Sequence, residues 1–123
     1  MIEEMEKVRG TVNTYLEAVK HKDWKKFQES WHPEAKMNFL REGEVHSVPR
    51  SFWEDWCKDP MNPEEKRTST IASIDVTENI AAAKVIALRE TPDERMILVD
   101  YLTLLQEDNR WLIISKSYTS KTL

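Results

Sequence analysis

The chain has 123 residues, 40% of them hydrophobic and 33% charged, which suits one domain over residues 1–123 built around one core. Its formal net charge of −4 argues against nucleic-acid binding, and no apolar run approaches the roughly 20 residues of a membrane span. A single cysteine, Cys57, excludes an internal disulfide, and two glycines are too few for a phosphate-cradling loop.

The N-terminal segment predicts one long amphipathic helix. Its acidic start, Met1-Ile2-Glu3-Glu4, lacks the basic head of a signal peptide, so we expect the protein to be cytoplasmic. The basic cluster Lys20-His21-Lys22 and Lys25-Lys26 falls where this helix meets the next one, and it is either solvated surface or an anion-contact patch. Apolar side chains recur at spacings of three and four along one stripe of the helix: Met5, Val8, Val12, Tyr15, Leu16 and Val19.

A second, shorter helix is predicted after Asp23, which can cap its N-terminus. Pro33 prevents the helix from continuing, and this leaves His32 at its C-terminal edge. The apolar stripe of this helix consists of Trp24, Phe27 and Trp31.

A strand pair is predicted next, over residues 35–40 and 44–48. It carries Phe39 and His46, and the alternation of the second strand leaves open whether His46 faces the interior or solvent. A capping-box spacing between Ser51 and Glu54 then predicts a third helix over residues 52–57. This helix displays Trp53 and Trp56.

The C-terminal half reads as a meander of strands over residues 69–76, 80–90, 95–106 and 110–119, separated by polar turns. Helices followed by a meander favour an α+β fold in which the helices cover one face of an antiparallel sheet. Both faces of the last two strands are apolar. The outer face therefore needs a cover, and we expect a homodimer through it.

Asp100 is a lone carboxylate in the apolar run 96–105. Such a group costs on the order of several kcal/mol of desolvation unless it is paired, protonated or in contact with water. A three-residue loop over 107–109 would set Asp100 opposite Lys116. The same register would put Trp111 and Ile113 on the face opposite to Asp100. Asp100 is then either half of a structural ion pair or part of a site.

Several strings resemble the nuclear transport factor 2-like superfamily. Tyr15-Leu16-Glu17-Ala18-Val19 and Trp31-His32-Pro33-Glu34-Ala35 are similar to its opening helices and first strand. Val99-Asp100-Tyr101-Leu102-Thr103 and Trp111-Leu112-Ile113-Ile114-Ser115-Lys116 are similar to its SnoaL-like branch labelled putative lumazine-binding. The resemblance covers nearly the whole chain and implies a cone-shaped, cystatin-like α+β fold with helices packed on a curved antiparallel sheet.

One enzymatic relative, ketosteroid isomerase, uses a helix tyrosine and a protonated strand aspartic acid as an oxyanion hole. Tyr15 falls at the position of that tyrosine, and Asp100 falls near that of the acid. Phe39 stands where the general-base carboxylate is expected, however, so steroid isomerisation is disfavoured. Lys116 opposite Asp100 would also favour the ionised form of the carboxyl group.

Three functions remain open. The protein is a ligand-binding domain with an apolar pocket for a small hydrophobic or aromatic molecule, an isomerase, cyclase or dehydratase acting on a small carbonyl compound, or a dimerisation module with a filled cone. The enzyme hypothesis uses His32 as the base and Tyr15 as the oxyanion donor, with Asp100 as a third candidate. No histidine pair has metal-ligand spacing, so we expect neither a metal nor a cofactor. The candidate pocket residues are Tyr15, Trp31, Phe39, Trp53, Trp56, Asp100 and Lys116.

Overall fold

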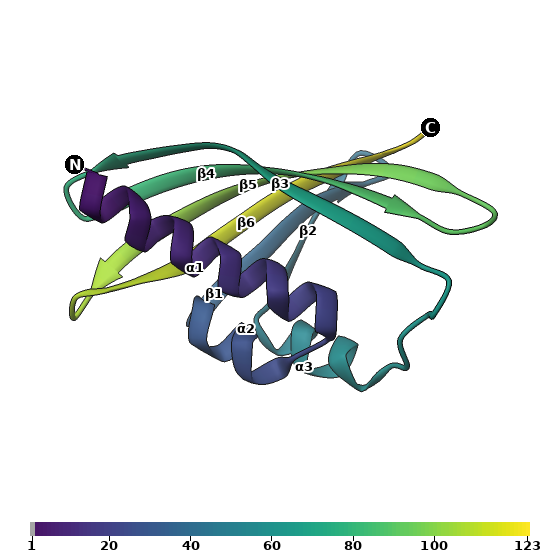
Figure 1. Cartoon of the computed structure of the whole chain (residues 1–123), viewed down its shortest axis with the longest axis horizontal. Helices are drawn as coiled ribbons and strands as arrows, with labels where there is room; N and C mark the ends of the chain where they lie inside the picture. The colour runs from purple at the N-terminus through teal and green to yellow at the C-terminus, as the bar shows by residue number, and fades with distance from the viewer. Residues whose placement is uncertain (1) are drawn as a thin grey trace.

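The helices of the protein lie on the concave face of a curved sheet (Figure 1), as seen in a computed structural model that describes residues 2–123. Helix α1 crosses the sheet, while α2 and α3 lie along its lower edge in that view. The elements in chain order are α1 (Ile2–His21), α2 (Trp24–Ser30), β1 (Trp31–Arg41), β2 (Glu44–Pro49), α3 (Ser51–Lys58), β3 (Lys66–Thr77), β4 (Ile80–Glu90), β5 (Arg95–Glu107) and β6 (Arg110–Thr122).

Helix α1 follows the predicted stripe, because its buried residues are Val8, Val12, Tyr15, Ala18 and Val19. The carboxylate of Asp23 accepts a hydrogen bond from the backbone N–H of Lys26 at 3.3 Å, which caps α2 as expected.

Helix α2 ends earlier than predicted, and Trp31 and His32 belong to strand β1 instead. Two effects explain why α2 ends before Trp31. Pro33 disfavours helical backbone angles in the residue before it, which is His32. Trp31 also pairs with Ile113 of β6 and is fully buried there, so extended backbone places its indole in the core.

The six strands are ordered β2-β1-β6-β5-β4-β3. All neighbouring pairs are antiparallel except β1 and β6, which run parallel, so the sheet is mixed rather than purely antiparallel. The predicted α+β fold with N-terminal helices on a curved sheet is confirmed. Strand β1 lies beside the last strand, β6, and β2 forms the edge of the sheet.

The hairpin between β5 and β6 differs from the expected register. Its turn has two central residues, Asp108 and Asn109, both with positive φ (51° and 64°), which is the type I′ geometry. Glu107 therefore pairs with Arg110, and the pairing shifts again beyond the Leu104–Ile113 pair. Asp100 lies opposite Tyr118, not Lys116.

The shifted register also reverses the expected facing of part of β6. Ile113 pairs with Leu104 of the core, so Ile113 and Trp111 are buried beneath the helices rather than on the outer face. A bulge at this point restores the phase of the strand, and Lys116 returns to the concave side with Asp100. The predicted facing of Trp111 and Ile113 was wrong, because a one-residue shift moves a side chain to the other face.

Candidate functional site

Three of the predicted residues meet beneath α1. The Tyr15 hydroxyl donates a hydrogen bond to Asp100 Oδ2 at 3.2 Å, and Lys116 Nζ lies 3.6 Å from the same oxygen. All three are buried, with 1%, 8% and 6% of their surfaces exposed in that order. We call these residues the polar trio. Asp100, whose carboxylate was predicted to need a partner, therefore has two partners, Tyr15 and Lys116.

Lys116 is surrounded by aromatic rings. Its ammonium lies 4.7 Å from the ring centroid of Tyr118, 5.0 Å from that of Trp53 and 5.5 Å from that of Tyr15. Rings at these distances attract a cation through their negative faces. Lys116 is thus held by one carboxylate and three aromatic faces.

Burial is the largest influence on the pKa of both Lys116 and Tyr15. Desolvation lowers the pKa of Lys116 to about 8, against the opposing effect of Asp100. Desolvation also raises the pKa of Tyr15 well above its usual value, and the charge of Asp100 adds to this effect. At neutral pH the lysine is therefore mostly protonated, and the tyrosine hydroxyl keeps the proton that it donates.

Two of the predicted pocket tryptophans pack into the core. Trp53 stacks on Phe27 with ring centroids 4.5 Å apart, and Trp31 lies 5.6 Å from the ring of Tyr15. The indole N–H groups of Trp31 and Trp53 are buried, and neither has a hydrogen-bond partner among residues 2–123. Trp56 is only half-buried, so it is the tryptophan of α3 whose ring reaches the surface.

Phe39 lies on the same face of β1 as the buried Ala35 and Met37. Its ring stacks on His46 at 5.4 Å and lies 5.3 Å from Tyr118, which is opposite Asp100 in the sheet. This stacking decides the facing of His46, which the strand pattern left open. Phe39 also lines a cavity of about 260 Å³ together with Arg41.

His32 is not brought together with the polar trio. Its Nδ1 accepts a hydrogen bond from the backbone N–H of Glu34 at 3.0 Å, and its Nε2 lies 3.3 Å from a carboxylate oxygen of Glu107. It lines a separate cavity of about 380 Å³ with Leu105 and Leu112. Its catalytic role stays a prediction, without contact to Tyr15 or Asp100.

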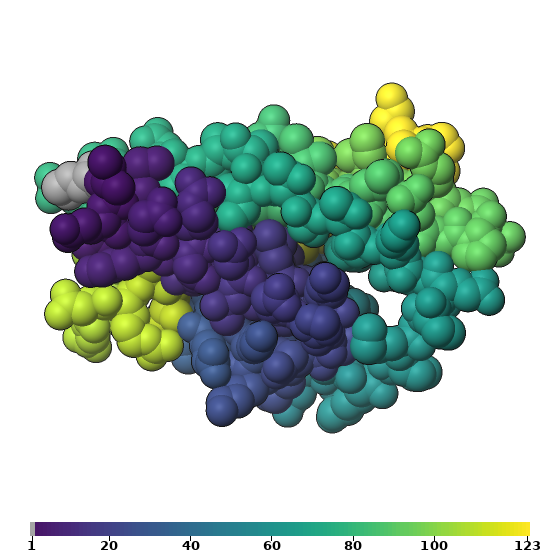
Figure 2. Space-filling model, in the orientation of Figure 1, coloured from purple at the N-terminus to yellow at the C-terminus, as the bar shows by residue number. Residues whose placement is uncertain are grey.

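A larger cavity, of about 540 Å³, lies between the C-terminal end of α1, helix α3 and the segment that precedes β3. Figure 2 shows it as an opening between the helices and the teal segment before β3. We call it the mouth cavity. Its lining consists of Val19, Lys20, His21, Lys22, Trp56, Pro60, Met61, Asn62, Glu65, Lys66, Arg67 and Thr68.

The basic cluster predicted between the helices contributes to this cavity. Lys22 Nζ donates a hydrogen bond to the carbonyl of Trp56 at 2.9 Å and lies 4.0 Å from the centroid of its ring. Arg67 was missed by sequence reasoning, because the strand was expected to begin at Ser69. In the structure β3 begins at Lys66, and Arg67 shares the inward phase of Ser69 and Ile71.

Within residues 2–123 no group of three or more His, Cys, Asp or Glu side chains is placed to hold a metal ion. None of the helices in this part of the chain combines the length and apolarity that a membrane span requires.

Comparison with known proteins identifies the family and the fold of the chain. Residues 3–119 match the model of a family described as putative lumazine-binding. The chain belongs to this family. The predicted nuclear transport factor 2-like fold is confirmed by solved structures, and no curated protein matches the chain significantly.

The structural relatives of this family member include two nuclear transport factor 2-like proteins of unknown function. One, from Silicibacter pomeroyi, is 25% identical with a TM-score of 0.79 and 97% of each chain covered. The other, from Shewanella baltica, is 19% identical with a TM-score of 0.83, covering 98% of this chain and 96% of its own. A putative ketosteroid isomerase from Shewanella frigidimarina is 15% identical, with a TM-score of 0.72 and coverage of 92% and 94%. These likenesses support the fold.

Proposed function

We propose that the protein binds a small, planar, mostly apolar molecule in the mouth cavity. The observation that carries the proposal is the chain of ring contacts between this cavity and the polar trio. Trp56 lines the cavity, and its ring lies 5.3 Å from the ring of Trp53. The Trp53 ring in turn lies 5.0 Å from the Lys116 ammonium, so two ring contacts join the cavity to the trio.

The size and walls of the mouth cavity suit such a ligand. Small-molecule sites usually enclose about 300–1,000 Å³, and they combine apolar walls with a few polar groups. Val19, Trp56 and Met61 supply the apolar surface here, and 56% of the Met61 surface is exposed. The description of the family as putative lumazine-binding also points to a flat heteroaromatic ligand, which the Trp56 ring can face.

The proposal assigns binding rather than catalysis. The base candidate His32 contacts Glu107 on another part of the molecule, and the Tyr15 hydroxyl already donates to Asp100. A general base must lie within hydrogen-bond reach of the proton that it removes. We propose that the trio, which does not itself line the mouth cavity, holds α1 against the sheet, while the residues that line the cavity select the ligand.

Nitrogen-15 NMR of the five tryptophan indoles tests the proposal. Titration with lumazine, 1-naphthoate and 1-naphthylmethanol should shift the Trp56 indole signal more than that of Trp24. Trp56→Leu should weaken binding at least tenfold, while the matched variant Trp24→Phe, whose ring does not line the cavity, should leave it unchanged. Absence of a Trp56 response to all three compounds would contradict the proposal.

We also propose that two copies associate through the outer face of the sheet. Four large apolar side chains on β4 and β5 are substantially exposed there: Ile80 (46%), Ile86 (37%), Tyr101 (57%) and Leu105 (40%). Lys84 and Asp75 lie on the same face, so a twofold axis can set each charge against its opposite in the second copy. Sedimentation should give a dimer mass, and Tyr101→Lys should shift it to the monomer. A monomer at all concentrations would contradict this proposal.

A further inference from the structure

Building on the proposed function, we infer that the ligand of the mouth cavity is an aromatic carboxylate and that the Arg67 guanidinium binds its carboxylate group. Arg67 differs from Arg89 and Glu65 beside it, because within residues 2–123 no ion pair compensates its charge.

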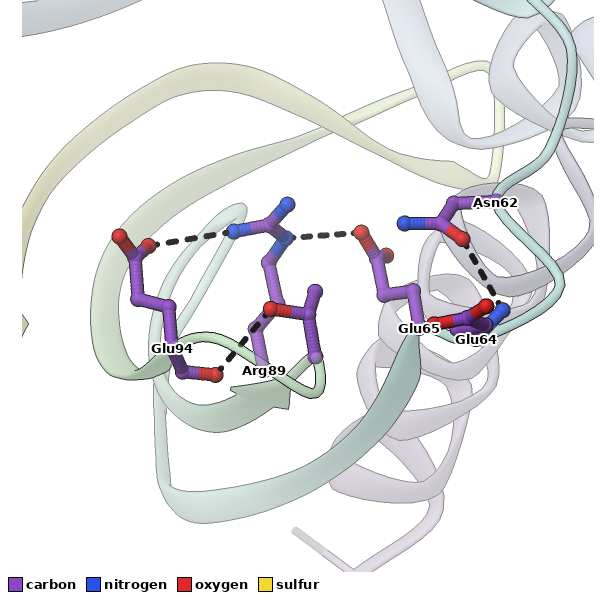
Figure 3. Close-up of polar contacts among 6 residues, drawn as sticks. Asn62, Glu64, Glu65, Arg89 and Glu94 are labelled. Atoms are coloured by element: carbon purple, nitrogen blue, oxygen red, sulfur yellow. Dashed lines mark hydrogen bonds and ion pairs between the residues drawn. The ribbon is translucent and has the colours of Figure 1, made fainter.

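Arg67 and Arg89 lie directly opposite each other on β3 and β4. Two like charges at such positions destabilise a sheet unless each has a counter-charge. Arg89 has two, because its Nε lies 2.8 Å from Glu65 and its Nη1 lies 3.7 Å from Glu94 (Figure 3). Arg67 forms no ion pair and no side-chain hydrogen bond with any of residues 2–123, although it is half-buried.

The surroundings of Arg67 deepen this imbalance. Lys20, Lys22 and Lys66 line the same cavity, and the only carboxylate in its lining, Glu65, is engaged by Arg89. Lys22 donates to a neutral carbonyl and lies over the Trp56 ring, and it forms no ion pair with a carboxylate among residues 2–123. The chain as a whole is acidic, with a net charge of −4, so this concentration of cations is local. An anion in the cavity would supply the missing counter-charge.

The dipole of α1 explains only some of the basic residues that line the mouth cavity. Basic residues in the last turn of a helix interact favourably with its dipole, and this accounts for Lys20 and His21 at the end of α1. His21 is also paired with Glu17 at 3.0 Å. Lys66 and Arg67 belong to β3, far along the chain, and no helix dipole explains them. Residues from two separate elements therefore converge on one cationic cavity.

The chemistry of the cavity selects the class of anion. A guanidinium presents parallel N–H donors that match the two oxygens of a carboxylate. Trp56 and Val19 bound the same space and favour an apolar ring beside that group. The volume of about 540 Å³ admits a two-ring molecule within the usual range of ligand sites. An aromatic ring with one carboxylate satisfies both requirements.

Calorimetric titration at pH 7 with 1-naphthoate and its neutral analogue 1-naphthylmethanol tests the inference. The natural protein should bind the carboxylate at least tenfold more tightly. Arg67→Gln should abolish this preference, and Arg67→Lys, which keeps the charge without the planar fork, should reduce it. Lys25→Gln is the matched control, because Lys25 is exposed on α2 outside the cavity lining, and it should keep the preference.

The stability of Arg67→Gln separates a binding role from a structural one. Removal of a guanidinium that faces Arg89 should leave the melting temperature unchanged or raise it. Equal affinity of the natural protein for both compounds, or a full preference retained in Arg67→Gln, would overturn the inference and leave the proposed function standing. Binding of neither compound would overturn the inference, and it would contradict the proposed function as well if lumazine also failed to bind.

Discussion

Lys116 and Asp100 form a buried ion pair without being opposed in the sheet. Their charged atoms are 3.6 Å apart, whereas the backbone register sets Asp100 against Tyr118 and Lys116 against Leu102. The two residues are therefore diagonal neighbours on the concave face. A long lysine side chain spans that diagonal easily, and the shared oxygen Oδ2 also accepts the Tyr15 hydroxyl. The pair links the sheet to helix α1 through a single carboxylate.

Removal of the Asp100 charge should destabilise the fold. Asp100→Asn leaves the Lys116 ammonium buried without a carboxylate, which costs about 3 kcal/mol of unfolding free energy. Urea denaturation measures this loss. Asp93→Asn, at an exposed position of the turn between β4 and β5, is the control and should change stability little. Equal stability of the two variants would mean that Asp100 is solvated.

The protonation of Lys116 should make stability depend on alkaline pH. Its pKa falls from the usual 10.5 to about 8 on folding, so between these values the unfolded chain binds more protons than the folded one. Stability contributed by this group therefore rises with pH over that window. Relative to Lys116→Met, the unfolding free energy should increase by about 2 kcal/mol from pH 8 to 9.5. Above pH 10 the raised pKa of Tyr15 acts with the opposite sign.

The control for this experiment is Lys121→Met, which removes an exposed lysine from the same strand. Its stability should run parallel to that of the natural protein between pH 8 and 9.5. A flat difference between the natural protein and Lys116→Met would show that Lys116 titrates as an ordinary surface lysine.

Loss of the Tyr15 hydroxyl should have a smaller effect. Tyr15→Phe removes one hydrogen bond to a carboxylate that keeps Lys116, which costs about 1–2 kcal/mol. Thermal unfolding provides the measurement. Tyr101→Phe, with a hydroxyl on the exposed face, should melt with the natural protein. The same melting temperature for both variants would argue that the buried hydrogen bond contributes nothing.

The two-residue turn between β5 and β6 predicts opposite effects of two substitutions. Asn109 has a φ of 64°, which glycine adopts without steric cost and alanine does not. Asn109→Gly should therefore raise the unfolding free energy by about 0.5 kcal/mol, while Asn109→Ala should lower it by about 1 kcal/mol. Chemical denaturation of the two variants compares them directly. An identical effect of both would be inconsistent with the type I′ turn.

Local sequence patterns predicted the elements well where one periodicity dominates. The stripe through Val8, Val12 and Tyr15 identified α1, and Asp23 identified the start of α2. The end of α2 was missed because the helical spacing of Trp24, Phe27 and Trp31 continues past the point where pairing with β6 extends the chain. A local pattern cannot reveal a partner that lies some 80 residues further along the chain.

Of the residues in the candidate site, the sequence identified some and missed others. Asp100 was identified from its burial cost alone, and the choice of Lys116 as its partner was correct although the register behind it was wrong. The turn type depended on whether Asn109 or both Asp108 and Asn109 take positive φ, which their residue types permit equally. Arg67 left no local signal, because its proposed role depends on the lack of an ion pair among residues 2–123, which the sequence does not reveal.

The sequence by itself determined the helices, the order of the strands along the chain, the family, and the presence of a carboxylate that must be paired. The elements and the carboxylate follow from periodicity and desolvation, which act between near neighbours or on single groups, whereas the family follows from the resemblance of whole strings. Only the tertiary structure decided that β1 runs beside β6, that His32 lies apart from Tyr15, and that Arg67 meets the basic end of α1 at one cavity. Those relationships join residues distant along the chain, so they depend on how the whole sheet curves beneath its helices.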